Sequence, residues 1–209
     1  MPPFLPTRGA IAAGHPLTAA AGREMLQLGG NAVDAAVAAT FASFVSENTL
    51  SAPGGGGFAL LFDAARGTRS LLDFFSTGPG LGRQRPLAPS EIDFEQITVD
   101  YGPSQQHFYV GRGSVAVPGN IAGLCTLAEY GRLSLPVLLE PAIRLARAGC
   151  PISPIQAFIG GLIEPILLRT PDSAAIFGRA GGGLKQAGEL VAMPALAATL
   201  EALGREGPA

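Results

Sequence analysis

The sequence predicts an α+β layered domain, and three observations carry that prediction. Residues 31–47 form a helical pattern that is apolar on nearly every face, as expected of a helix buried in a core. A glycine run then leads into two short apolar segments, 58–63 and 70–75, that are typical of strands. From residue 120 onward the pattern is helical. Strands with helices on both sides in the sequence suit a layered α+β arrangement.

The N-terminal elements follow from turn and capping residues. Residues 9–14 predict a short buried strand, and residues 16–28 predict a helix that ends at two glycines. His15, beside a proline, is expected to be a hydrogen-bonding turn residue and not a catalytic one. Asn31 is expected to cap the buried helix, with Asp34 reaching back three residues later. The apolar positions of that helix include Val33, Ala36, Val37, Phe41, Phe44 and Val45.

The two strands are expected to pair as an antiparallel hairpin, because residues 64–68 have the length and the glycine of a hairpin turn. The first of them, 58–62, has the composition of a buried strand. The glycines at 54–57 let the backbone pack where no side chain would fit. Residues 77–110 carry four prolines and scattered charge and predict a long surface loop without a motif.

The C-terminal half predicts helices at 120–130, 136–148, 153–168 and 194–203, with a kink at Pro165 and a turn at residues 181–183. No internal repeat and no clear domain boundary is visible in the sequence. We therefore expect residues 1–209 to be a single segment.

Composition excludes several classes of protein. Of the 209 residues, 47% are apolar and only 14% are charged, which indicates a large core and not a disordered chain. The formal net charge is −2 and no basic stripe occurs, so neither nucleic acid nor a membrane surface is an expected partner. No uncharged run approaches the roughly 20 residues of a membrane span.

Metal and cofactor motifs are not found. Cys125 and Cys150 lie outside any CxxC pattern or histidine cluster and are expected to be small apolar side chains. The glycine run follows a helix and opens a strand, the reverse of a phosphate-binding loop, and no Lys-Ser/Thr comes after it. Ser114 does not lie in a Gly-x-Ser-x-Gly elbow. We expect no metal and no cofactor. The first eight residues do not resemble a signal peptide, which predicts a cytoplasmic protein unless the true start lies elsewhere.

Two blocks, GGNAVDAAVA at residues 29–38 and GGGGF at 54–58, together resemble the gamma-glutamyltranspeptidase family. The similarity continues through residues 72–74, 113–119 and 141–149. Members of this family are N-terminal-nucleophile hydrolases, made as one precursor that cuts itself into a large and a small subunit. The resemblance implies part of an αββα sandwich, in which two sheets stack between helical layers. It covers only the N-terminal part of a large subunit.

The resemblance also implies the chemistry. The family nucleophile is a threonine at the new N-terminus of the small subunit, and its own α-amine serves as base. No threonine here matches that motif, so we assign no catalytic residue and expect this chain alone to be inactive. The missing downstream sequence is an expected partner.

One substrate contact of the family falls within this chain. The family usually shows Asp-Phe-Arg-Glu at the second strand, and its arginine holds the α-carboxylate of the gamma-glutamyl group. Here the arginine position is Phe75 and the glutamate position is Ser76. A phenyl ring cannot bind a carboxylate, so these substrate-binding positions predict an acyl group without one. The alternative is that Phe75 is only a core strand residue.

Arg66, Arg69 or Arg83 is a candidate to replace the missing arginine. Three functions therefore stay open: part of an enzyme that hydrolyses or transfers gamma-glutamyl amides in glutathione metabolism, an acylase or amidase with a non-glutamyl small-molecule substrate, and a non-catalytic relative that acts as a structural or binding module.

Overall fold

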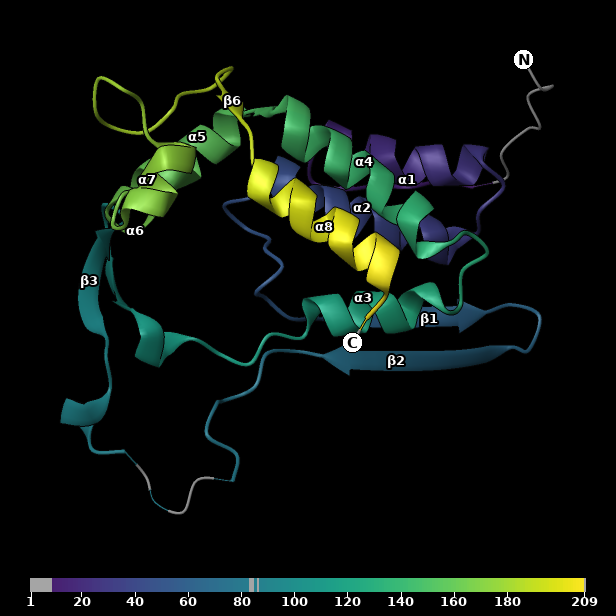
Figure 1. Ribbon diagram of the computed structural model, residues 1–209, viewed down its shortest axis with the longest axis horizontal. Coiled ribbons are helices and arrows are strands. Elements are labelled where there is room, and N and C mark those ends of the chain that lie inside the picture. The colour runs from purple at the N-terminus through teal and green to yellow at the C-terminus, as the bar shows by residue number, and fades with distance from the viewer. Residues whose placement is uncertain (1–8, 83–84, 86, 209) are drawn as a thin grey trace. The chain divides into compact units, whose positions relative to one another are not determined.

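The structure is a computed structural model that describes residues 9–82, 85 and 87–208 (Figure 1). The chain divides into two compact units. The first combines Met1–Phe75, Pro118–Cys150 and Val191–Ala209, and the second combines Ser76–Val117 with Pro151–Leu190. The sequence pattern gives no sign of this division, because each unit is assembled from segments that are far apart along the chain.

Helices dominate the first unit. They are α1 (Pro16–Gln27), α2 (Ala32–Ser46), α3 (Asn120–Ala128), α4 (Leu135–Ala148) and α8 (Pro194–Glu206). α2 packs against α1 and α4, and α4 packs against α8 (Figure 1). The five helices predicted in these parts of the chain are confirmed within one to three residues at each end.

The central helix α2 is as buried as its composition predicts. Val37, Phe41 and Val45 are inaccessible to solvent, and Phe41 meets Phe44 edge to face with ring centroids 5.8 Å apart. Ala36 is the exception among the predicted core positions, because it is exposed. It lies beside an open groove between α2 and the following strand, so no side chain covers it.

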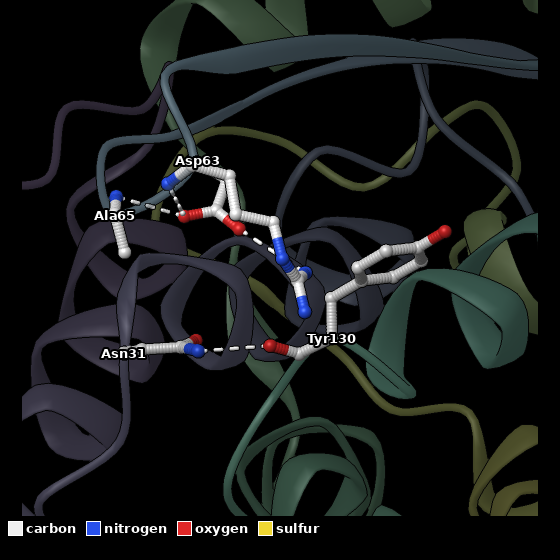
Figure 2. A network of polar contacts seen from close by, with 5 residues as sticks. Asn31, Asp63, Ala65 and Tyr130 are labelled. Atoms are coloured by element: carbon white, nitrogen blue, oxygen red, sulfur yellow. Dashed lines mark hydrogen bonds and ion pairs between the residues drawn. The ribbon is translucent and has the colours of Figure 1, made fainter.

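The start of α2 is fixed by a polar corner, which we define as Asn31, Asp34, Tyr130, Arg132 and Leu133. Asn31 accepts hydrogen bonds from the backbone N–H of residues 33 and 34, and Asp34 accepts one from the Asn31 N–H at 2.6 Å, so the predicted capping box is confirmed. Asp34, fully buried, also accepts from the N–H groups of Arg132 and Leu133 at 2.9–3.0 Å. The Asn31 amide donates to the Tyr130 carbonyl at 2.9 Å (Figure 2). The corner therefore ties α2 to the connection between α3 and α4.

The predicted hairpin is confirmed. β1 (Gly57–Asp63) and β2 (Thr68–Phe74) pair antiparallel, with Gly57 opposite Phe74 and Asp63 opposite Thr68. Asp63 closes the turn by accepting hydrogen bonds from the N–H groups of Ala65 and Arg66, at 2.9 and 3.2 Å (Figure 2). The register of the hairpin determines which side chains lie on the same face.

The expectation that 58–62 is a buried strand is wrong for this chain. Phe58, Leu60 and Phe62 are each more than half exposed and alternate with partly buried neighbours. The reason is that α3 packs on one face of the hairpin only, and no other element of the first unit, within the described ranges, covers the opposite face (Figure 1). On the covered face, Phe74 lies so close to Gly119 and Gly123 that a Cβ at either position would overlap it.

The predicted strand at residues 9–14 is also wrong. These residues form no regular element and are mostly exposed. A strand needs a neighbour to accept its backbone hydrogen bonds. Within the described part of the chain no strand pairs with this segment.

The second unit corrects the predicted loop at 77–110. This stretch contains an antiparallel hairpin, β3 (Glu95–Asp100) with β4 (Gln105–Val110), together with two short 3-10 turns, η1 (Pro89–Glu91) and η2 (Arg112–Ser114). Its less exposed side chains alternate along both strands, as at Ile97 opposite Phe108. The many prolines outside this hairpin hide that alternation in the sequence.

The helix predicted at 153–168 is broken and not merely kinked. It forms α5 (Pro154–Leu162) and α6 (Glu164–Leu167), followed by α7 (Pro171–Phe177). Pro165 lies in the first turn of α6, where a residue without an N–H starts a new helix easily. The turn predicted at 181–183 is confirmed, with positive φ at Gly182 and Gly183. β5 (Cys150–Pro151) and β6 (Leu190–Val191) form a third, very short strand pair.

Candidate functional site

Phe75 follows the last residue of β2 and points away from the helical face. The Asp73 carboxylate accepts a hydrogen bond from the Phe75 N–H at 3.0 Å, which fixes the backbone as it leaves the strand. Phe74 packs against α3, whereas Phe75 is 58% exposed. The two rings therefore lie on opposite faces of the hairpin, as the alternation of side chains along a strand requires. Ser76, the second predicted position, is partly exposed and belongs to the second unit.

The structure brings Phe58 to Phe75, a contact that the sequence analysis missed. The two rings are nearly parallel, with an interplanar angle of 10° and centroids 5.4 Å apart. Phe58 lies opposite Asp73 in the hairpin register, two residues before Phe75. The observed turn, residues 64–67, is one residue shorter than the predicted turn at 64–68, which would place Phe58 opposite Phe74. The contact was missed for this reason and because Phe58 was interpreted as a buried strand residue.

Of the three candidate replacement arginines, the two that the structure describes, Arg66 and Arg69, lie at the turn end of the hairpin, away from Phe75. Arg69 lies over the Phe62 ring, 5.1 Å from its centroid, and Phe62 is its register partner near the turn. Six residues of extended chain separate Arg69 from Phe75, a span of about 20 Å. Arg66 pairs with Asp63 in the turn itself. Arg83 lies outside the described residues.

The charge at the Phe75 end of the hairpin is therefore negative. Among the residues of β1 and β2, all of which the structure describes, Arg69 is the one cation, and Asp73 is the charged side chain next to Phe75. Within β1 and β2, no guanidinium lies at this end of the hairpin to form the bidentate contact that an arginine makes with a carboxylate.

The glycine run holds the start of β1 against α3. The Gly55 carbonyl accepts from the N–H groups of Gly119 and Asn120, both at 3.0 Å. The Asn120 amide donates to the Ala52 carbonyl at 2.7 Å. Gly57 has the Phe74 ring 3.1 Å from where its Cβ would be. These glycines serve close packing, and the N–H groups at the start of α3 are used by a carbonyl of the same chain.

The cysteines and histidines are the remaining candidates for a nucleophile or a metal ligand, and their surroundings indicate structural roles. Cys125 and Cys150 are buried, and burial raises the pKa of both thiols, which disfavours the reactive thiolate. His15 caps α1 by accepting from the Leu17 N–H at 3.1 Å, which confirms its predicted turn role, and His107 contacts Thr98 on the neighbouring strand. The described residues hold no group of three or more His, Cys, Asp or Glu side chains placed to bind a metal.

Within the same ranges, no helix has both the length and the apolar character needed to cross a membrane.

Solved structures define the class of this fold. A gamma-glutamyltranspeptidase from Helicobacter pylori superposes with a TM-score of 0.77 at 30% identity, over 98% of this chain and 56% of that one. A cephalosporin acylase from Bacillus halodurans gives 0.70 at 26% identity, over 98% of this chain and 38% of that one. The chain thus has the α+β fold of part of an N-terminal-nucleophile hydrolase sandwich.

The family follows from the sequence comparisons. The model of the gamma-glutamyltranspeptidase family matches residues 18–209, and the chain belongs to this family. An Acylase ACY 1 proenzyme from a Pseudomonas species is 36% identical over 205 residues, which are 97% of this chain and 36% of that protein. A glutathione hydrolase proenzyme from Escherichia coli is 30% identical over 209 residues, 99% of this chain and 34% of that protein. The chain spans about a third of the length of these curated relatives.

Proposed function

We propose that this chain is the N-terminal part of the large subunit of an amide-cleaving acyltransferase that hydrolyses or transfers gamma-glutamyl groups. One observation carries the proposal: the family model matches residues 18–209, nearly the whole chain. The relatives are glutathione hydrolases and acylases, and both names imply that an amide bond is cleaved. Residues 1–209 are then a single segment of that subunit.

The proposed reaction follows the N-terminal-nucleophile scheme. A threonine hydroxyl supplied by later sequence attacks the amide carbonyl, and its α-amine takes the proton. The C–N bond breaks, the proton passes to the leaving amine, and an acyl ester remains on the threonine. Water or a second amine then cleaves the ester and restores the hydroxyl. This chain contributes part of the frame and one end of the donor site.

A second candidate, an acylase for non-glutamyl donors, is favoured by the residue at position 75. A buried carboxylate without a partner costs several kcal/mol, and Phe75, Phe58 and Asp73 offer none. An uncharged acyl group meets no such penalty at these side chains. We propose Phe75 and Ser76 as donor-site positions on this basis.

Two anilides test the proposal and separate its alternatives. The full-length protein that contains this chain is assayed with gamma-glutamyl-p-nitroanilide and with a neutral acyl p-nitroanilide, beside the 209-residue chain as control. We expect the full-length protein to cleave at least one of them and the chain alone to cleave neither. Preference between the two separates a transpeptidase from an acylase. A correctly folded full-length protein that cleaves neither is a non-catalytic relative.

Turnover by the 209-residue chain, after contamination is excluded, would overturn the assignment of the nucleophile to later sequence. The search would then turn to Ser76, Ser114 and Cys125 within this chain.

A further inference from the structure

We propose that Phe58 and Phe75 work as a pair, an aromatic platform that favours donors with a flat, uncharged aromatic acyl group. The inference rests on the second candidate of the proposed function, an acylase for non-glutamyl donors, because it assigns a chemical class to one end of that donor site. Its new element is Phe58, which the family comparison does not single out and which the sequence suggests only as a strand residue.

The geometry of the two rings supports a shared binding surface. They are nearly parallel and displaced, with centroids 5.4 Å apart, which is a favourable stacking arrangement. Each remains 58% exposed in spite of the contact. In this displaced stack the rings overlap only in part, and each keeps exposed apolar ring surface. A third ring can therefore stack on that exposed surface without displacing either of them.

The backbone positions the two rings next to each other before any donor binds. Phe58 lies on the outer face of β1 opposite Asp73, and Phe75 is the next outward residue beyond Asp73. The two rings are diagonal neighbours across an antiparallel pair, a spacing that aromatic side chains bridge. The hydrogen bond from the Phe75 N–H to the Asp73 carboxylate holds the chain in place after the last strand residue. Asp73 is thus a positioning residue, and little order has to be created when a donor binds.

The charge around the platform explains why the preferred donor is uncharged. The faces of aromatic rings carry partial negative charge, and Asp73 adds a carboxylate beside them. The nearest cation on the two strands is Arg69, four residues from Asp73 and about 13 Å along β2. A donor carboxylate would meet repulsion here and no partner. A neutral aromatic acyl group gains stacking and avoids that repulsion.

Substitutions on one face of β1 test the platform in the full-length enzyme. The donors are phenylacetyl-p-nitroanilide and hexanoyl-p-nitroanilide, both uncharged, and the readout is the ratio of their kcat/KM values. We expect Phe58→Leu and Phe75→Leu each to lower the phenylacetyl-to-hexanoyl ratio by about three- to tenfold, the size of one aromatic contact. The control is Phe62→Leu, an equally exposed ring four residues along the same face, which should leave the ratio unchanged.

Three further variants sharpen the test. Phe58→Tyr retains the ring and should retain the ratio. Asp73→Asn retains an acceptor for the Phe75 N–H and should leave the phenylacetyl-to-hexanoyl ratio unchanged. Asp73→Ala removes that acceptor and should lower the ratio. If Phe58→Leu does not mature, Phe58→Met removes the ring with a more adaptable side chain and takes its place.

The inference is overturned if Phe58→Leu leaves the ratio unchanged in a mature enzyme, or if Phe62→Leu lowers it as much. That result leaves the proposed function intact when the parent enzyme still cleaves anilides. A parent that cleaves no anilide refutes the proposed function and this inference together.

Discussion

Both faces of the β1–β2 hairpin carry apolar side chains, but the two faces have different roles. On the inner face Ala59, Leu61, Leu72 and Phe74 are partly buried, and Phe74 fits against two glycines at the start of α3. The outer face leaves five large apolar side chains exposed: Phe58, Leu60, Phe62, Leu71 and Phe75. An αββα sandwich stacks two sheets, so one sheet seen by itself presents such a face. The inner face therefore stabilises this chain, whereas the outer face is left for a second sheet and, under the proposed function, for a donor at its Phe75 end.

Substitutions among the helices of the first unit should destabilise the chain most. Of these, we expect Asp34→Ala, in the polar corner, to have the largest effect on the free energy of unfolding. The substitution leaves the backbone N–H groups of Asn31, Arg132 and Leu133 buried or half-buried without their acceptor. We expect a loss of about 3 kcal/mol or more in the free energy of unfolding. Urea unfolding followed by circular dichroism measures it.

The matched control for that substitution is Asp63→Ala. Asp63 also accepts from backbone N–H groups, but in an exposed turn, so the loss should stay near or below about 1 kcal/mol. Equal losses for the two variants would contradict the distinction between a buried corner and an exposed turn.

The contact between β2 and α3 is the next most sensitive point. Gly123→Ala adds a methyl group that overlaps the Phe74 ring, so we expect a loss of about 1–3 kcal/mol from overpacking. Gly161→Ala is the control, since that helical glycine is exposed and its added methyl meets no atom within 4 Å. The control should be neutral or stabilising by about 0.5–1 kcal/mol, because alanine favours a helix. A stable Gly123→Ala protein would mean that the inner face is not tightly packed.

The sequence predicted an element correctly where the residues that determine it lie close together along the chain. The capping box at Asn31 and Asp34, the end of α1 at Gly29 and the hairpin turn all depend on nearby residues, and all were predicted correctly. Residues 9–14 and the burial of 58–62 depend on partners distant in sequence, and those predictions failed.

The same limit applies to the candidate site. Strand alternation is local and predicts that Phe74 and Phe75 lie on opposite faces, as they do in the structure, whereas the role of Phe75 at a donor site stays a prediction. The stacking of Phe58 on Phe75 requires the hairpin register together with both side-chain directions, and it was missed. The hairpin at 95–110 was missed for a further reason, because the surrounding prolines outweighed a short alternating pattern.

The outer face should contribute least to the stability of this chain. Leu60→Thr removes an exposed side chain, 75% accessible, so the free energy of unfolding should change by less than about 0.5 kcal/mol. The same substitution should reduce self-association of the 209-residue chain, since exposed apolar faces drive association. Sedimentation velocity at several concentrations measures this. A parent chain that is monomeric at every concentration would contradict the expectation.

The role of Phe75 in selecting the donor is tested most directly by Phe75→Arg in the full-length enzyme. We expect an unchanged fold and a rise of about ten- to a hundredfold in the ratio of kcat/KM for gamma-glutamyl-p-nitroanilide to that for a neutral acyl p-nitroanilide, because a charge-assisted contact is worth roughly 1.5–3 kcal/mol. A folded, mature variant whose ratio equals that of the parent would contradict it. Phe75 would then be a packing residue, and the outer end of the hairpin would take no part in selecting the donor.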